Sequence, residues 1–418
     1  MCPIKWVENP NPDSAAFGVE LGKLMPPGIA EKVRGFHSSI PDFEPTPLKK
    51  LSALSRMLGV GGIWVKDEAE RLDLSAFKVL GGSYAVYRVL KEKLGIEGEI
   101  SFDELVSDET RKKLGDMTFA AATDGNHGRG VAWSASRLGQ SSVIYVPRET
   151  KKFRIVAIEK YGARVEVIDG TYDEAVELIK ADSEKNGWQL VSDTAVGDYQ
   201  EIPLWVMQGY MTMYSEIEET LLEEGVGLPT HVFFQSGVGS FAASALAYWS
   251  EKAGDNPPKF VMVEPDKAAC FYDSMIKGDG EAYTFPGDLD TIMAGLSCGR
   301  PNPIAWELFK NSETVYLSCA DYVAARGMRI YAAPLEDDPV VIAGESGAPT
   351  LGALTFIMQN PKLAELKDSL GLDENSRILL INTEGDTDPI YYRQIVWEGA
   401  NAVPEKERMS PENSGFDL

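Results

Sequence analysis

The stretch "THVFFQSGVGSFAASALAYWSEK", residues 230–252, decides the fold class because it joins three recognisable parts. An apolar run typical of a buried strand comes first, and an alanine-rich helical pattern comes last. Between them lie glycines and hydroxyls, where several backbone N–H groups can turn toward one anion at a helix N-terminus. We therefore expect a strand–loop–helix unit that binds a phosphate group through Ser236, Gly237, Val238, Gly239 and Ser240.

The same alternation of strand and helix patterns continues along most of the chain. Strand-like runs include "GIWVKD" (62–67), "TFAAA" (118–122), "SVIYVP" (142–147), "KFVMVEP" (259–265) and "SRILLINT" (376–383). Such alternation predicts an α/β fold with mostly parallel sheets between helices, in which ligands bind beyond the carboxyl ends of the strands. Both ends of the chain are polar, and we expect them to be loosely held.

Composition and charge narrow the class of protein. The chain has 418 residues, more than the ~250–300 at which a single core stops growing, so two domains are expected. A net charge of −24 argues against nucleic acid or an anionic membrane surface as a partner. No apolar run approaches the roughly 20 residues of a membrane span. The expected partner is therefore a small molecule.

The cysteines and histidines indicate the cellular compartment and whether a metal is bound. The four cysteines are widely spaced without a CxxC pair, which is typical of a reducing, cytoplasmic compartment. The three histidines lack the spacing of metal ligands, so we expect no metal site.

The stretch "LSAFKVLGGSYAVYR", residues 74–88, sets Lys78 among apolar and small residues. Its periodicity predicts a helix from about Phe77 with one apolar face. Two interpretations of Lys78 remain open at this point. Either the side chain reaches past apolar neighbours to water, or it is a desolvated amine kept reactive for Schiff-base chemistry.

Two further loops bring polar side chains to the ends of strands. In "ATDGNHGRG" (122–130), Asp124, Asn126 and His127 lie among glycines, and Asn126 can donate a hydrogen bond to a phenolate-type oxygen of a pyridine ring. We expect His127 to be a structural hydrogen-bonding residue. In "SDTAVGDYQE" (192–201), Asp193 directly follows a predicted strand and is well placed to face a ligand.

The glycine loop alone does not separate a phosphate cradle from a dinucleotide site. Gly237, Gly239 and Ala242 also fit the pattern G-x-G-x-x-A, and Glu264 closes the next strand, where a ribose-binding acid would stand. An NAD-dependent oxidoreductase is therefore an alternative from another functional class. The polar group around Asn126 argues against it, because a nicotinamide site gives no reason for such a cluster.

Taken together, these strings resemble the diaminopropionate ammonia-lyases, which are fold-type II pyridoxal-phosphate enzymes. The resemblance rests on "KDE…AFKVLGGSYA", "ATDGNHGRGVAWSA", "YQEIPLWVMQGYMTM", "TIMAGLSCGRPN" and "LLINTEGDTDP", between about residues 66 and 389. It implies two open twisted, mostly parallel sheets flanked by helices, with pyridoxal 5'-phosphate in the cleft between domains. The implied large domain comprises residues 1–88 and 210–418, and a small mobile domain comprises 89–209. It also implies a homodimer.

The resemblance implies a role for each matching residue. Lys78 is the Schiff-base lysine, Asn126 bonds the ring oxygen, and the loop from Ser236 to Ser240 holds the phosphate. Thr383 faces the pyridine nitrogen, and Glu345 lies in a cofactor-side segment. Two substrate-side aspartates match Asp124, which is the base for the D-isomer, and Asp193. The chain departs from the family pattern at "RLDLSA" (71–76), where an aromatic residue and a glycine more often follow the arginine.

The implied reaction is α,β-elimination of D- and L-2,3-diaminopropionate to pyruvate and ammonia. A serine or threonine dehydratase of the same fold is the alternative. A charge argument favours the diamino acid, since an amine leaves as ammonia only when protonated, and two carboxylates, Asp124 and Asp193, suit a cationic substituent.

Overall fold

The computed structural model describes residues 2–123, 125–170 and 172–408, which form two compact units. The first unit takes in the described parts of residues 1–23, 46–70 and 216–418. The second takes in those of residues 24–45 and 71–215. The domain boundaries and the cleft expected from the resemblance stay a prediction.

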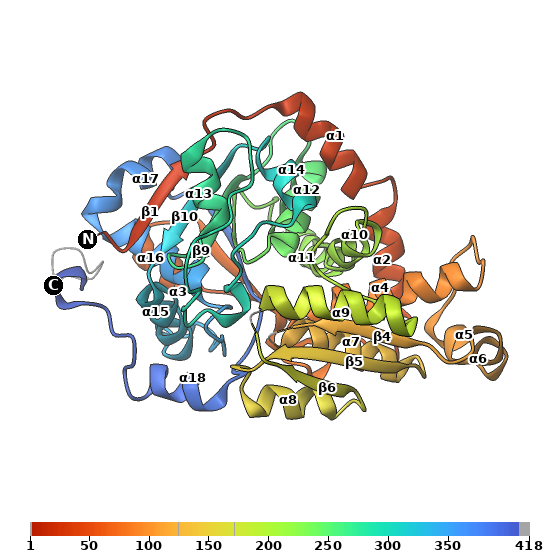
Figure 1. Ribbon diagram of the computed structural model, residues 1–418. Helices are drawn as coiled ribbons and strands as arrows, with labels where there is room; N and C mark the ends of the chain where they lie inside the picture. Colours follow the sequence, from red (N-terminus) through yellow and green to blue (C-terminus); the bar gives the residue numbers. More distant parts are fainter. Residues whose placement is uncertain (1, 124, 171, 409–418) are drawn as a thin grey trace. The chain divides into compact units, whose positions relative to one another are not determined.

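The first unit is built on a seven-stranded sheet with the order β1-β10-β9-β8-β11-β3-β2. Figure 1 labels β1, β10 and β9 of this sheet. Its inner pairs are parallel, and only the edge strands β1 and β2 pair antiparallel with their neighbours. The inner strands are buried on both faces, which explains their continuous apolar runs. The strands are β1 (Ile4–Glu8), β2 (Leu48–Lys50), β3 (Gly62–Asp67), β8 (His231–Gln235), β9 (Lys259–Pro265), β10 (Thr314–Cys319) and β11 (Arg377–Asn382).

Helices surround this sheet and bury its main apolar core, which includes Val65, Phe233, Val263, Leu317 and Leu380. α11 begins in the second unit and ends in the first. The α-helices are α1 (Ser14–Leu24), α3 (Ser52–Leu58), α11 (Met211–Glu223), α12 (Ser240–Ala253), α13 (Cys270–Lys277), α14 (Pro303–Phe309), α15 (Asp321–Ala332), α16 (Pro349–Gln359), α17 (Ala364–Leu370) and α18 (Pro389–Val396). Short 3-10 helices are η1 (Glu68–Asp73), η2 (Ala294–Leu296), η3 (Pro361–Leu363) and η4 (Glu405–Glu407).

The second unit is built on a four-stranded, all-parallel sheet with the order β6-β5-β4-β7. α7 and α9 pack on β4 and β5, and α8 packs on β6 (Figure 1). The strands are β4 (Thr118–Ala122), β5 (Ser141–Pro147), β6 (Arg164–Ile168) and β7 (Gln189–Leu190). The helices are α2 (Ile29–Ser38), α4 (Lys78–Lys93), α5 (Phe102–Val106), α6 (Asp108–Leu114), α7 (Asn126–Arg137), α8 (Lys152–Glu159), α9 (Tyr172–Asn186) and α10 (Glu201–Gly209).

The α/β class with mostly parallel sheets is confirmed, and so are the strands at residues 62–67 and 118–122. Residues 9–14, which we expected to be loosely held, follow the edge strand β1, and the Asn9 side-chain amide donates to the carbonyls of Lys310 and Ser312. The polar C-terminal residues 410–418 lie outside the described residues. The strand β1 itself, Ile4–Glu8, was not predicted. The sheet edge offered this segment hydrogen-bonding partners that its own sequence does not reveal.

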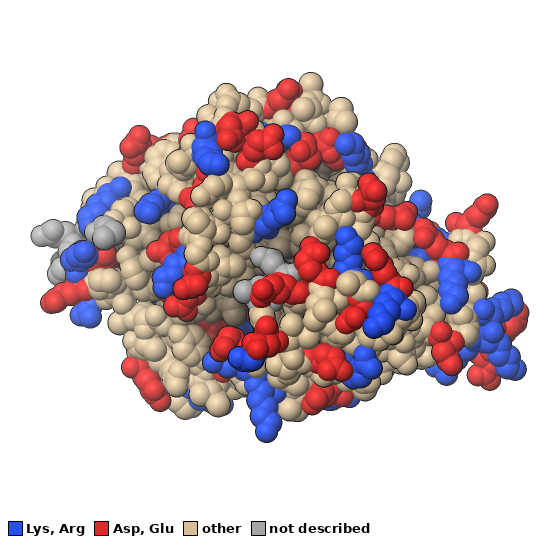
Figure 2. Space-filling model, in the orientation of Figure 1, with Lys and Arg blue, Asp and Glu red and all other residues tan. Residues whose placement is uncertain are grey.

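Acidic and basic side chains are interspersed over the face of the molecule seen in Figure 2. Among the described residues, none of the helices combines the length and apolarity that a membrane crossing requires.

Candidate functional site

Lys78 is the first residue of α4 and follows a strained loop. Leu72, Asp73 and Ser75 all have positive φ, at 49°, 56° and 52°. Such backbone favours glycine, so the departure from the family pattern at "RLDLSA" places side chains where they cost conformational energy. The Arg129 side chain holds the loop by donating to the Leu74 carbonyl at 2.8 Å.

Glycines set the position of α4 by letting neighbouring helices approach it closely. A Cβ at Gly209 on α10 would lie 2.5 Å from the Leu80 carbonyl oxygen, and one at Gly130 on α7 would lie 2.9 Å from Val79 Cα. A Cβ at Gly81 would lie 2.6 Å from the ring of Tyr210. Any side chain there would push the helices apart. These glycines, one on α4 and one each on α7 and α10, therefore let the neighbouring helices fix the start of α4.

The Lys78 amine is paired with Asp193. Lys78 Nζ lies 3.1 Å from Asp193 Oδ2, with side-chain exposures of 19% and 6%. A charge-assisted hydrogen bond of this kind fixes both groups more firmly than a neutral one. The pairing joins residues 115 positions apart, so the sequence named both residues without showing that they meet.

The loop that carries Asp193 is anchored on both sides. His127 Nε2 donates to the Val191 carbonyl at 2.8 Å, which fits the structural role expected for this histidine. The Tyr199 hydroxyl donates to the Leu190 carbonyl and accepts from the Ser192 N–H. Burial raises the pKa of Tyr199, which keeps the hydroxyl a neutral donor.

Tyr210 is a neighbour of this pair that sequence reasoning missed. Its hydroxyl is buried, which raises its pKa, and the charges of Lys78 and Asp193 shift that pKa in opposite directions. Its ring packs against Phe77, with centroids 4.8 Å apart. The signal was present in the string "WVMQGYMTM", but nothing in its spacing points to a ligand.

Asn126 is the first residue of α7, which packs against α4, and its side chain is half-buried. Asp124 lies outside the described residues. The predicted roles of Asn126 and Asp124 stay predictions.

In the first unit, the glycine loop joins β8 to α12 as the sequence predicts. Gly239 has φ 95°, and a Cβ there would lie 2.4 Å from the Phe271 ring, so only glycine fits. Ser236 and Ser240 are buried, whereas Gly237 and Val238 are half-buried. A loop of this kind before a helix N-terminus fits a phosphate group.

Thr383 follows β11, the strand next to β8, so its side chain lies beside Gln235 at the end of β8. Gln235 Nε2 donates to Thr383 Oγ1 at 2.9 Å and to the Ser346 carbonyl at 2.9 Å. Glu345, just before Ser346, is buried. This group of hydroxyl, amide and carbonyl fits the polar edge of an aromatic ring. Gln235 itself was missed by sequence reasoning.

Glu264 does not fit the ribose-binding role of the NAD alternative. It is fully buried in β9 and accepts hydrogen bonds from the backbone N–H groups of Phe271 and Tyr272, at the start of α13. Burial raises its pKa to about 8. The Glu264 carboxyl group therefore serves as a structural helix cap, and the acid that the dinucleotide pattern requires is not available to a ligand.

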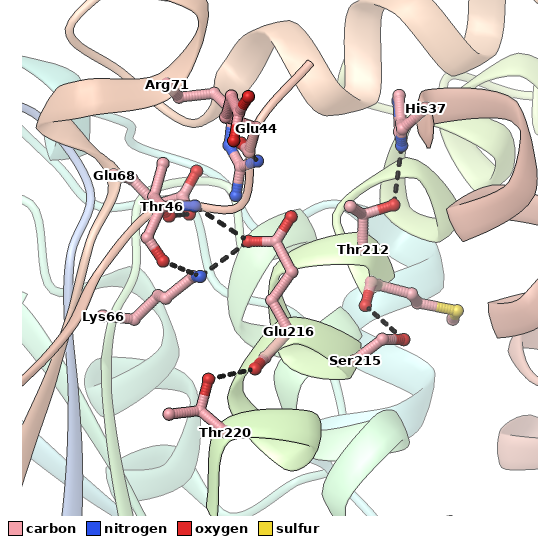
Figure 3. A network of polar contacts seen from close by, with 11 residues as sticks. His37, Glu44, Thr46, Lys66, Glu68, Arg71, Thr212, Ser215, Glu216 and Thr220 are labelled. Atoms are coloured by element: carbon pink, nitrogen blue, oxygen red, sulfur yellow. Dashed lines mark hydrogen bonds and ion pairs between the residues drawn. The ribbon is translucent and has the colours of Figure 1, made fainter. Parts of the chain in front are cut away.

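The structure also contains a buried ionic cluster, which we call the Lys66 cluster (Figure 3). Lys66 Nζ lies 2.6 Å from Glu216 Oε2 and donates to the Thr46 carbonyl, and the Thr46 hydroxyl donates to Glu68. A buried lysine inside a strand has no signature in the sequence. Elsewhere in Figure 3, His37 pairs with Thr212 at 2.6 Å.

Comparison with known proteins gives a consistent result. Residues 40–384 match the family model described as pyridoxal-phosphate dependent enzyme. A diaminopropionate ammonia-lyase from Salmonella typhimurium is 44% identical over 401 residues, covering 96% of this chain and 99% of the relative.

Solved structures from Escherichia coli are similar over nearly the whole chain. A diaminopropionate ammonia-lyase in complex with D-serine has a TM-score of 0.88 and 41% identity, covering 96% of this chain and 98% of the other. The same enzyme in complex with an aminoacrylate-PLP azomethine reaction intermediate has a TM-score of 0.84 and 42% identity, covering 97% and 99%.

Proposed function

We propose that this chain, which belongs to the family of pyridoxal-phosphate dependent enzymes, converts 2,3-diaminopropionate and water to pyruvate and two molecules of ammonia. The observation that carries the proposal is the pair formed by Lys78 and Asp193, in which a carboxylate already holds an amine cation at 3.1 Å. The near-full-length likeness to diaminopropionate ammonia-lyases supports the same substrate. A substrate with a cationic β-amino group suits this carboxylate better than a neutral hydroxy amino acid does.

Bound pyridoxal phosphate supplies a conjugated ring that accepts electrons from the substrate Cα. In our proposal Lys78 Nζ would hold the cofactor and, as a free amine, would accept the α-proton of the L-isomer. Asp193 holds the leaving amino group in its protonated form, which is the form that departs as ammonia.

The remaining predicted residues bind the cofactor. The loop of Ser236, Gly237, Val238, Gly239 and Ser240 binds the phosphate with its backbone N–H groups and hydroxyls. Asn126 bonds the ring oxygen, Thr383 bonds the ring nitrogen, and Glu345 lines the same side. What supports the phosphate and ring-nitrogen roles is the glycine loop between β8 and α12 and the hydrogen bond between Gln235 and Thr383. The roles of Asn126 and Glu345 rest on the family resemblance.

The test of the function is a comparison of substrates. The purified chain, loaded with pyridoxal phosphate, is given D- or L-diaminopropionate, serine or threonine, and pyruvate or 2-oxobutyrate is measured together with ammonia. We expect diaminopropionate to have the highest kcat/KM and added NAD to have no effect. A higher kcat/KM for serine or threonine would establish the dehydratase alternative instead.

Asp193→Asn is expected to weaken the reaction of diaminopropionate selectively. Losing a charged hydrogen bond to the β-amino group should lower kcat/KM about 10- to 100-fold, whereas serine elimination should fall less. Steady-state kinetics with both substrates measure the difference. Asp198→Asn is the matched control, since Asp198 is an exposed aspartate of the same loop. Equal losses for diaminopropionate and serine would contradict the role of Asp193.

In our proposal Asp124 is the base that removes the α-proton of D-diaminopropionate, by analogy with the family. Asp124→Asn removes a base but keeps the shape of the side chain, so D-diaminopropionate should lose about 10²–10⁴-fold in kcat. The L-isomer should lose much less, because Lys78 serves it. Separate assays of the two isomers check this, and a parallel loss would show that Asp124 does not discriminate between them.

We also propose that the chain forms a homodimer and works in the cytoplasm. The family resemblance supports the first point, and the widely spaced cysteines support the second. Light scattering of the purified chain tests the assembly.

A further inference from the structure

We propose that Gln235 is a positioning residue that sets the direction of the Thr383 hydroxyl proton. The inference rests on the proposed function, because its consequence concerns the ring nitrogen of bound pyridoxal phosphate. Gln235 is buried at the end of β8, outside the set of residues given roles above.

The orientation of the Gln235 amide is fixed by its surroundings. Its Nε2 lies 2.9 Å from the Ser346 carbonyl oxygen and 3.1 Å from the Ile381 carbonyl oxygen. Carbonyl oxygens only accept hydrogen bonds, so the atom that faces them must be the nitrogen. Turning the amide over would set its oxygen against two other oxygens, which is unfavourable.

This orientation constrains Thr383. The same Nε2 lies 2.9 Å from Thr383 Oγ1, and an amide nitrogen can donate but cannot accept. The two N–H hydrogens of the amide are shared among Thr383 Oγ1 and the two carbonyls, and the hydroxyl proton of Thr383 cannot point at this nitrogen, so it must point elsewhere. Within the described part of the chain, the acceptor in reach of this proton is the Ser346 carbonyl oxygen, at the long distance of 3.4 Å, and that oxygen already accepts from Gln235.

The Thr383 hydroxyl can donate this proton to a nearer acceptor, such as the ring nitrogen of bound pyridoxal phosphate. A ring nitrogen that receives a hydrogen bond from a hydroxyl is held in its unprotonated form, because a protonated nitrogen would itself need an acceptor. By facing one lone pair of Thr383 Oγ1 with an N–H and leaving the hydroxyl proton only a long contact within the described protein, Gln235 favours Thr383 as a donor to an unprotonated ring nitrogen.

The same arrangement recurs in the glycine loop. Asn302 Oδ1 accepts from the Ile304 N–H, which fixes the amide, and its Nδ2 then donates to Ser240 Oγ at 2.8 Å. The Ser240 oxygen accepts on that side, so its proton is also directed elsewhere, as a phosphate would require. Asn302 precedes a proline at the start of α14, which is a recognisable helix start.

The test measures the ring nitrogen directly. Wild type and variants are reconstituted with pyridoxal phosphate labelled with ¹⁵N in the ring, and the nitrogen chemical shift is followed against pH. Gln235→Leu, and Gln235→Met as a second packing of the same space, should move the shift toward that of Thr383→Val, which lacks the hydroxyl. Thr383→Ser should keep the wild-type shift. Cofactor affinity should fall about 2- to 10-fold in the Gln235 variants.

Gln208→Leu is the matched control, because it removes another buried amide that donates to a carbonyl, that of Leu24. It should leave the nitrogen shift unchanged. A wild-type shift in both Gln235 variants, or an equal change in Gln208→Leu, overturns the inference while the proposed function stands. A wild-type chain that binds no cofactor overturns the proposed function, and this inference with it.

Discussion

Lys78→Met is expected to abolish the visible colour of the cofactor-loaded protein and to lower kcat at least about 10³-fold. Methionine fills a similar volume but has no amine, so it can neither link to the cofactor aldehyde nor accept the α-proton. The visible spectrum after removal of free cofactor and the rate of pyruvate release measure the two effects. Borohydride reduction of wild type, followed by peptide mapping, should place the label at Lys78.

Lys93→Met is the matched control, since Lys93 is an exposed lysine on the same helix α4. It should keep both colour and rate. A Lys78→Met protein that stays coloured and turns over at the wild-type rate would remove the basis of the proposed chemistry.

The second large effect concerns stability. Lys66 and Glu216 form an ion pair with both side chains 1% exposed. Glu216→Gln removes one charge and leaves the Lys66 ammonium buried without its closest counter-charge, so the free energy of unfolding should fall by about 3–5 kcal/mol. Lys66→Met should cost a similar amount for the same reason. Urea unfolding, followed by circular dichroism, measures both.

The double variant Lys66→Met with Glu216→Gln tests the cause. Since neither charge remains, it should be more stable than the two losses added together predict. Glu109→Gln is the surface control, because Glu109 pairs with Lys113 at 2.8 Å where water screens the charges, and it should leave stability nearly unchanged. If Glu216→Gln and Glu109→Gln lowered the free energy of unfolding by similar amounts, burial would not be the reason why the Lys66 cluster matters for stability.

Much of the fold was predictable because burial leaves a local pattern. A few neighbouring residues are enough to identify β8 as a buried strand, the glycines after it as a turn and the alanine-rich α12 as a helix. The edge strand β1 was not predictable. Its residues pair with β10, more than 300 positions away, and an edge strand needs no distinctive composition to form such a ladder.

The candidate site also contains residues that the sequence indicated and residues that it did not. The residue types around Lys78 and Asn126 and the glycine loop indicated the cofactor class, because that chemistry needs particular side chains in particular local settings. Tyr210, Gln235 and the Lys66 cluster were missed. Each matters through a neighbour remote in the chain, as Gln235 does through Thr383, 148 positions away.

The sequence by itself determined the α/β class and the glycine loop between a strand and a helix, because short-range periodicity and the local demands of glycine backbone encode both. A phosphate at that loop and the Schiff-base role that the family resemblance implies for Lys78 stay predictions. Only the tertiary structure decided which polar groups meet: the carboxylate of Asp193 at the Lys78 amine, and the amide of Gln235 at the Thr383 hydroxyl. The physical reason is that a hydrogen bond depends on distance and direction in space, which are set when the whole chain packs.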